Sequence, residues 1–502
     1  MKVKKHFLLV ALFSVLSLTV ALTACGSAAG DNGATNTSNN SGNNNNPGDN
    51  NNPGDNGGSS ISNPKREVFG FFGPEWLITY IMSRNAGNEY SETEDTAEAS
   101  GSEPSVTNSI RAANRVQINV MSYTGEEPGM IEECISALNL DCTMDTTIIA
   151  TTNGMYQPAL DKMLEDGLVD IFMGESAFVT KYSHDDESKY VAPYEDFIEN
   201  FDDKLKAADI AKYIGEVGTN KNGKIVALTT WSAGCCFIYR RSIAKKVFGT
   251  DNPDEIGTII GAKTGSWDKF LAAAEKCKEK GYAMISGLGD IYRMIEGSSS
   301  GWFDENNKLQ IDEKQEAYLE IAKEIIENGW SNNTRDWTDA WYADMRGKDG
   351  TYGDWAVCLP PTGAFWGGAW YFVTKEALKN PKKKQVIADI IEYLTLNTTN
   401  EGGMYKFISA KGSELTYGAA SGIVMQNADG TFDYCKGQDI HKIYAQADKM
   451  VNNTHTTVYD ETINSFWQEQ VREYAEGHKT KDEAIKTLKE KVKAEFSEIV
   501  VD

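Results

Sequence analysis

One short motif in this chain matches a catalytic pattern by residue type and spacing. Residues 297–301 read GSSSG, which fits the Gly-x-Ser-x-Gly elbow that presents a serine nucleophile. That elbow requires a strand before it and a helix after it. Here IYRMIE precedes the motif, and WFDENNKLQID, a strand–turn–strand pattern, follows it. The surroundings therefore predict a Gly/Ser loop and no nucleophile.

Metal-binding and phosphate-binding motifs have little support. Neither H-E-x-x-H nor G-x-x-x-x-G-K-[ST] occurs, and the eight cysteines include no C-x-x-C pair. Residues 304–313, DENNKLQIDE, resemble a calcium loop but lack its central glycine and terminal spacing, so we predict a hairpin turn. We therefore expect no catalytic residue, no metal site and no cofactor.

The first 24 residues have the pattern of a secretory signal peptide. Three lysines, at positions 2, 4 and 5, precede an uninterrupted apolar run at 7–22, and residues 22–25 read LTAC. This ending matches the lipobox of bacterial lipoproteins, in which the cysteine becomes lipidated. We therefore predict a lipid on Cys25 and a position on the extracellular face of the cytoplasmic membrane; a plain signal peptide is the alternative. Two acyl chains anchor a protein stably where one does not.

A polar tether is predicted after the lipid. Residues 25–66 are rich in Asn, Gly and Ser, and NNNPGD occurs twice between residues 44 and 55. Such a composition buries too little apolar surface to fold by itself. The next segment, 67–113, begins with the aromatic run EVFGFFGPEWLITYIM and ends in a polar stretch. The simplest interpretation of the aromatic run is a strand or helix that packs on the main domain; a contact with a partner or membrane is the alternative.

The excess of acidic residues excludes some classes of binding partner. The formal charge of −24 becomes −27 for residues 25–502 once the three lysines of the leader are subtracted. Such a charge repels nucleic acid and anionic headgroups, so we expect no nucleic-acid partner.

From residue 115 onward, strand and helix patterns alternate. Residues 115–123 and 168–176 read as strands, 223–231 and 235–241 as short strands. Amphipathic helices are predicted at 264–281, 313–329, 383–396 and 481–496. An alternating order over about 390 residues predicts an α/β fold with at least two lobes.

The order of several weak motifs resembles the family 1 extracellular solute-binding proteins of ABC importers, relatives of maltose-binding protein. VQINVMSYTGEEPGM resembles the first strand and ligand-facing turn of that family, and GKIVALTTWSAGCCFIYRRSIAKKVFG and GSWDKFLAAAEKCKEKG resemble later stretches. GLVDIFMGES is similar to another strand, although Val169 stands where the family usually has proline. Residues 67–113 match nothing in the pattern.

The resemblance implies a type II periplasmic-binding-protein-like fold, with two lobes that close on a sugar at a hinge. It places lobe one at 115–228 plus 371–410 and lobe two at 229–370 plus 411–502. It also implies an oligosaccharide ligand, delivery to importer permease subunits and a monomeric protein without enzymatic activity.

A sugar site needs flat aromatic rings for the apolar C–H faces and carboxylates for the hydroxyls. The residues that the resemblance turns towards the cleft and that suit these roles are Tyr123, Glu126, Glu175, Trp231, Asp290, Tyr292, Trp355, Trp366 and Trp467. Core packing competes with this interpretation for every tryptophan. Within PPTGAFWGGAWYFVT (360–374), we expect Trp366 to meet the ligand and Trp370 and Phe372 to be core.

Two other functions fit some of these features. The negative charge fits a binding protein for a cationic ligand such as a polyamine, a peptide or ferric ion. A surface enzyme acting on polysaccharide is the third hypothesis, without a motif of its own.

Overall fold

The structure of the chain is a computed structural model, which describes residues 66–75, 77–78, 115–151, 154–184, 186–304, 306–334, 353–408, 417–452 and 457–501. The predicted signal peptide, the lipidation site Cys25, nearly all of the tether and most of segment 67–113 lie outside these ranges.

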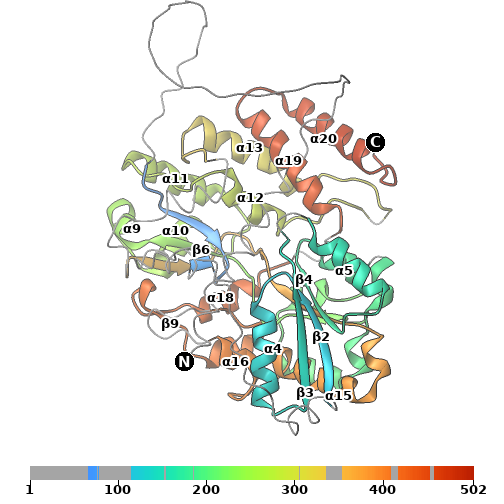
Figure 1. Cartoon of the computed structure of the whole chain (residues 1–502). Helices are drawn as coiled ribbons and strands as arrows, with labels where there is room; N and C mark the ends of the chain where they lie inside the picture. Colours follow the sequence, from blue (N-terminus) through green and yellow to red (C-terminus); the bar gives the residue numbers. More distant parts are fainter. Residues whose placement is uncertain are drawn as a thin grey trace, which may run out of the picture.

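The lower part of the molecule in Figure 1 is built on a five-stranded mixed sheet. Its strands, in spatial order, are β3 (Cys142–Ile148), β2 (Val116–Ser122), β4 (Ile171–Glu175), β8 (Ala369–Val373) and β5 (Ala227–Leu228). β2 pairs in parallel with β3 and β4, whereas β8 pairs antiparallel with β4 and β5. The strands predicted at 115–123 and 168–176 are therefore present as β2 and β4.

Strand β8 reads AWYFV without polar residues because both of its faces are buried. On one face the ring of Phe372 stacks on Phe172 of β4 at 4.9 Å, and the indole nitrogen of Trp370 donates to the carbonyl of Ile214 at 3.1 Å. On the other face the hydroxyl of Tyr371 lies 3.8 Å from the sulfur of Met130. The expected core positions of Trp370 and Phe372 are confirmed, since neither side chain is exposed.

Helices surround this sheet. They are α4 (Glu126–Ala137), α5 (Tyr156–Glu165), α6 (Val179–Ser183), α7 (Phe201–Ala208), α8 (Lys212–Val217), α15 (Pro381–Thr395) and α16 (Gly403–Phe407), with the 3-10 turns η3 (Asp186–Tyr190), η4 (Tyr194–Asp196) and η6 (Ala377–Lys379). Helices α4 and α15 contact β2, while α6 contacts β4 and α8 contacts β5. The helix predicted at 383–396 corresponds to α15. It begins at Pro381, and the side chain of the preceding residue, Asn380, caps its first turn.

A second, three-stranded sheet lies beside the first. Its order is β1 (Gly70–Gly73), β6 (Cys236–Arg240), β7 (Trp355–Cys358), all antiparallel. Strand β1, the blue arrow in Figure 1, comes from the aromatic run that had no counterpart in the family pattern. The simpler interpretation of that run is confirmed for these four residues: they form a strand of the main fold.

The three-stranded sheet is buried on both faces. Phe71, Ile238 and Val357 point to one side, which is covered by residues 417–451. That segment contains α17 (Gly422–Asn427), α18 (His441–Asp448), the turn η7 (Asp433–Cys435) and the hairpin of β9 (Thr431–Phe432) and β10 (Gln438–Asp439).

The other face carries Phe72, Phe237 and Cys358, and it packs against the helices of the upper part of Figure 1. These helices are α9 (Arg241–Phe248), α10 (Pro253–Ile260), α11 (Asp268–Glu279), α12 (Leu288–Glu296), α13 (Glu313–Glu327), α19 (Asp460–Ala475) and α20 (Lys481–Glu495). The helices predicted at 264–281, 313–329 and 481–496 correspond to α11, α13 and α20. The two sheets and their helices form the two lobes, whose predicted residue boundaries stay a prediction.

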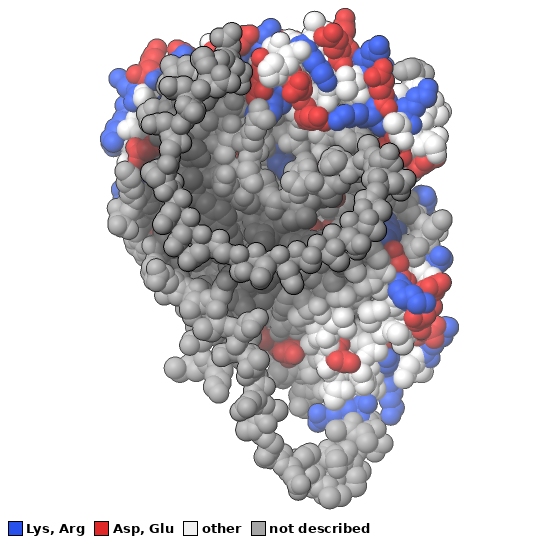
Figure 2. Space-filling view, turned by 45° about the horizontal axis from the view of Figure 1, so that its top comes forward, with Lys and Arg blue, Asp and Glu red and all other residues white. Residues whose placement is uncertain are grey.

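Acidic and basic side chains are interspersed over the upper part of the molecule (Figure 2). Lys481 of α20 forms an ion pair with Glu316 of α13 at 2.7 Å, and Lys491 of α20 pairs with Glu469 of α19. Ion pairs of this kind neutralise individual acidic side chains at this end, while the net charge of the chain stays negative.

The cysteines of the described ranges are free thiols, and every one of them is buried. They pack as small apolar side chains. In the part of the chain that the structure describes, no helix has both the length and the apolar character needed to cross a membrane.

The packing of β1 predicts a large effect of truncating its central side chain. Phe71 is fully buried and contacts the ring of Trp355 edge-on at 6.0 Å. We expect Phe71→Ala to lower the free energy of unfolding by about 3–5 kcal/mol, measured by urea denaturation. Leu138→Ala, at a side chain that is 41% exposed, should change it by less than about 0.5 kcal/mol. Equal effects of the two substitutions would mean that β1 is not part of the folded core.

Candidate functional site

Two chain segments cross between the sheets and pair with each other. One runs from β5 to β6 (229–235), and the other runs from β7 to β8 (359–368). The amide of Cys235 donates to the carbonyl of Ala364 at 2.8 Å, and the amide of Trp366 donates to the carbonyl of Ala233 at 2.9 Å. A third segment joins them, because the amide of Ser232 donates to the carbonyl of Gly418 at 2.7 Å. These contacts bring Trp231, Trp366 and Tyr417 to one place.

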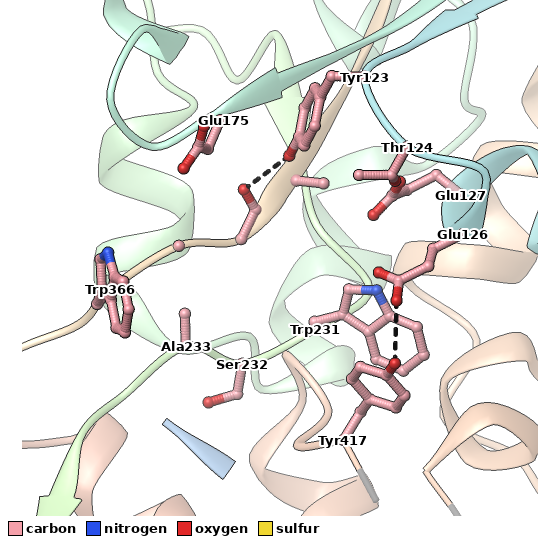
Figure 3. Close-up of a pocket in the computed structure, with 13 residues that line it drawn as sticks. Tyr123, Thr124, Glu126, Glu127, Glu175, Trp231, Ser232, Ala233, Trp366 and Tyr417 are labelled. Atoms are coloured by element: carbon pink, nitrogen blue, oxygen red, sulfur yellow. Dashed lines mark hydrogen bonds between the residues drawn. The ribbon is translucent and has the colours of Figure 1, made fainter. Parts of the chain in front are cut away.

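A cavity of about 60 Å³ lies at this crossing. Its walls come from the turn after β2, the end of β4 and the crossing segments (Figure 3). The residues that line it are Tyr123, Thr124, Glu126, Glu127, Glu175, Trp231, Ser232, Ala233, Trp366, Gly367, Gly368, Ala369 and Tyr417.

Aromatic rings form much of the wall. The rings of Trp231 and Tyr417 stack with their centroids 4.5 Å apart and an interplanar angle of 29°. Trp231 is 6% exposed, and its indole nitrogen has no hydrogen-bond partner among the described residues. Trp366 is half-buried, and the guanidinium of Arg293 lies 5.3 Å from the centre of its ring.

Three carboxyl groups share this wall with the rings. Glu126 and Glu127 open helix α4, where the positive end of the helix dipole favours negative charge. The hydroxyl of Tyr417 donates to Glu126 at 3.1 Å, and the hydroxyl of Thr124 donates to Glu127 at 2.8 Å. Glu175 ends β4, and its carboxyl group has no hydrogen bond from any described residue.

The environment raises the pKa of these acids. Burial is the main cause for Glu126, the charge of Glu127 adds to it, and the hydrogen bond from Tyr417 opposes it, which leaves a pKa of about 8. The pKa of Glu175 is also raised to about 8, mainly by burial and further by the charge of Glu461, against the opposing charge of Arg293. Burial likewise raises the pKa of Glu127. Glu126 and Glu175 therefore hold their protons at neutral pH in this structure.

Further hydrogen bonds hold side chains of the wall in place. The hydroxyl of Ser232 donates to the buried carboxyl group of Asp448, whose two oxygens lie 2.6 and 2.7 Å away. Gly234 allows this approach, since a Cβ there would lie 2.2 Å from an oxygen of Asp448. The hydroxyl of Tyr123 donates to the carbonyl of Gly368 at 3.3 Å.

The structure brings together five of the nine residues predicted for a ligand site. Tyr123, Glu126, Glu175, Trp231 and Trp366 all line the cavity.

The other four lie elsewhere, which corrects the sequence-based placement. Asp290 accepts hydrogen bonds from the amides of Ser286 and Gly287 and so caps helix α12. The hydroxyl of Tyr292, which is buried, donates to Asn464 at 2.6 Å.

Trp355 and Trp467 are also core residues. Trp355 is 1% exposed within β7, and Trp467 packs edge-on against Trp302 at 6.1 Å. Their positions in the family order suggested a cleft, but the sheet and helix faces that carry them point inward.

Sequence reasoning missed Thr124, Glu127, Ser232 and Tyr417. The acidic pair EEPG after the first strand was a usable signal for Glu127, since it lies next to the predicted Glu126. Tyr417 had no such signal, because it reaches the cavity through the long-range bridge between Trp231 and Ala419.

The raised pKa of Glu175 predicts a pH dependence of stability. The folded protein keeps a proton that the unfolded chain releases above the ordinary pKa of 4.5, so this contribution is complete below pH 4.5 and is lost as the pH rises to about 8. Glu175→Gln should make the fall of the free energy of unfolding with pH shallower by up to about 1.4 kcal/mol per pH unit. Urea denaturation at pH 5, 6, 7 and 8 measures this slope. Glu132→Gln, on an exposed position of α4, should leave it unchanged; an unchanged slope in Glu175→Gln would contradict the assignment.

Comparison with known proteins gives matches at the level of structure. No protein-family profile matches the sequence, and no curated protein matches it. A solved structure described as extracellular solute-binding protein family 1 superposes with a TM-score of 0.61 at 16% identity, covering 74% of this chain and 98% of that one. The sugar-binding protein MalE from Xanthomonas citri gives 0.56 at 14% identity, covering 76% and 97%.

The galacto-N-biose/lacto-N-biose I-binding protein of the ABC transporter from Bifidobacterium longum gives a TM-score of 0.54 at 14% identity, covering 77% of this chain and 99% of that chain. Identities this low establish the fold. The chain therefore has the two-lobe α/β fold of the family 1 extracellular solute-binding proteins.

Proposed function

We propose that this protein captures an oligosaccharide outside the cell and delivers it to the permease subunits of an ABC importer. The observation that carries the proposal is the cavity at the crossing between the two sheets, in which aromatic rings and buried carboxyl groups face the same space. The fold supports it, since the structurally similar proteins named above include sugar-binding proteins and the binding protein of an ABC transporter.

The chemistry of the wall suits a sugar. Trp231, Tyr417 and Trp366 offer flat apolar faces to C–H groups, and Glu126 and Glu175 offer oxygens to hydroxyls. A protonated carboxyl group both donates and accepts a hydrogen bond, so it can pair with a neutral hydroxyl without a buried net charge.

Binding requires the lobes to move. A volume of about 60 Å³ lies well below the roughly 300–1,000 Å³ of typical small-molecule pockets. The paired crossing segments are the connections about which the lobes would open, and a ligand that contacts both lobes shifts the balance towards the closed form. The importer would then receive the loaded, closed form.

We propose capture without catalysis. In the GSSSG motif, Ser299 lies three residues after the end of helix α12, and its hydroxyl donates to the carbonyl of Glu296 at 2.8 Å. The strand–turn–helix context of a nucleophile elbow is not found at this position. In the DENNKLQIDE segment, the carboxylate of Asp304 accepts from the amides of Asn306 and Lys308, as in a turn.

Replacing Trp366 of the crossing and Trp370 of β8 by alanine, one at a time, tests the site. Trp366→Ala should weaken oligosaccharide binding about ten-fold or more, because it removes a stacking face, while stability changes by less than about 1 kcal/mol. Trp370→Ala should lower the free energy of unfolding by about 3–5 kcal/mol and leave the affinity of the folded fraction close to wild type. Calorimetric titration with a panel of neutral oligosaccharides and with spermidine, together with urea denaturation, measures both. Similar effects of the two substitutions, or binding of spermidine and of no sugar, would overturn the proposed site.

Lipid anchoring at Cys25 is the second part of the proposal and rests on the LTAC signal. In a bacterium that expresses the full chain, the wild-type protein should sediment with the membranes, whereas Cys25→Ser should be released into the soluble fraction. Ser41→Ala, within the tether, serves as the matched control and should sediment like the wild type. A membrane-bound Cys25→Ser protein would refute the anchor.

A further inference from the structure

The hydroxyl groups that line the cavity all direct their protons to acceptors of the protein. Tyr417 donates to Glu126 and Thr124 donates to Glu127, at 3.1 and 2.8 Å. Tyr123 donates to the carbonyl of Gly368, and Ser232 donates to Asp448. These four side chains therefore have no proton left to offer to a ligand.

Acceptor atoms remain available on the same wall. Tyr417 reaches one oxygen of Glu126, and the second oxygen has no partner among the described residues. Glu175 is only 7% exposed, yet neither of its oxygens receives a hydrogen bond from the described part of the chain. Figure 3 shows the two carboxyl groups on different sides of the cavity, with their oxygens directed into it. A buried polar group without a partner is costly, and such groups gather at functional sites.

The charges near the cavity are also unbalanced. Glu126, Glu127 and Glu175 line it, and Glu461 acts on Glu175 from outside. Arg293 opposes this charge at Glu175, but its guanidinium lies over the ring of Trp366 and 3.6 Å from Glu296. One shared guanidinium faces several acids, and Glu126 and Glu175 stay protonated beside it; a positive group from a ligand would favour their ionised form and pair with it.

A neutral sugar does not match this wall fully. Each sugar hydroxyl both donates and accepts, and the four hydroxyl groups of the wall are already engaged; the donors that remain are the indole N–H of Trp231 and the protonated carboxyl groups of Glu126 and Glu175. An ammonium group donates three hydrogen bonds and accepts none. We propose that the oligosaccharide taken up by this cavity carries a protonated amino group that binds Glu126 or Glu175, so that the ligand is an amino sugar. This inference rests on the proposed function and specifies the class of its ligand.

A series of three trisaccharides that share one backbone tests the inference. They are the β-1,4-linked glucosamine trisaccharide, its fully N-acetylated form and cellotriose, which carry an amine, an amide or a hydroxyl at the same carbon. The protein is the chain from residue 25 with Cys25→Ser, titrated by calorimetry. We expect the amine form to bind about ten-fold or more tightly than either of the others, because charge-assisted hydrogen bonds are the stronger ones. Glu175→Gln or Glu126→Gln should remove most of that preference, whereas Glu132→Gln on the exposed face of α4 should retain it.

The outcomes separate this inference from the proposed function. Equal or tighter binding of cellotriose or the N-acetylated form, absence of binding by all three, or full retention of the preference in both Gln variants would overturn the amino-sugar assignment. The calorimetric panel of neutral oligosaccharides tests the proposed function independently. Binding of any member of that panel supports oligosaccharide capture, even if the amine gives no gain in affinity. Binding of spermidine at the same site without binding of any saccharide would overturn both.

Discussion

The structure depends on the way in which the chain crosses between its two sheets. A backbone that leaves a sheet and stays buried must find new partners for its N–H and C=O groups. Here the two crossing segments supply those partners to each other, through Cys235 with Ala364 and Trp366 with Ala233. Close packing of this crossing requires glycine: a Cβ on Gly363 would lie 2.1 Å from the carbonyl oxygen of Met450. The crossing connects the two lobes, and it carries Trp231 and Trp366 of the cavity wall.

The cavity buries acids at a cost, and the surrounding core offsets that cost. Strand β1 adds Phe71 and Phe72 to opposite faces of the three-stranded sheet, and the chain just after it places Glu75 2.7 Å from His441, with both side chains fully buried. Burial alone would lower the pKa of His441, but the charge of Glu75 and its hydrogen bond raise it overall. An N-terminal segment thus takes part in the fold beside the crossing, and a rigid surrounding of this kind lets unfavourable groups persist at a site.

The fold was more predictable than the site because its signals are local. Periodicity located β2, β4, α11, α13 and α20, since each carries its own apolar pattern and its own end signals. Site placement requires knowing which face of an element meets which partner, and the sequence does not hold that information locally. Trp231 and Trp355 were both expected at the ligand site, yet Trp231 lines the cavity and Trp355 is buried on the face of the sheet that residues 417–451 cover. Tyr417 lies at the cavity because Ala419, two residues further along the chain, forms a β-bridge with Trp231. No rule of sequence spacing predicts this long-range contact.

The residues that determine the fold are not the residues that would bind a ligand. This explains how the structure of a family 1 solute-binding protein can superpose with a TM-score of 0.61 at only 16% sequence identity. The sheets need apolar residues of suitable volume, and many sequences supply them. The proposed ligand site instead rests on a few polar groups beside the strands, such as Glu126 and Glu175, which can change without disturbing the sheet. A shared fold therefore carries little information about which ligand is bound. We propose that this information lies in the donors and acceptors around the crossing, where the four hydroxyl groups are engaged and the carboxyl group of Glu175 receives no hydrogen bond from the described residues.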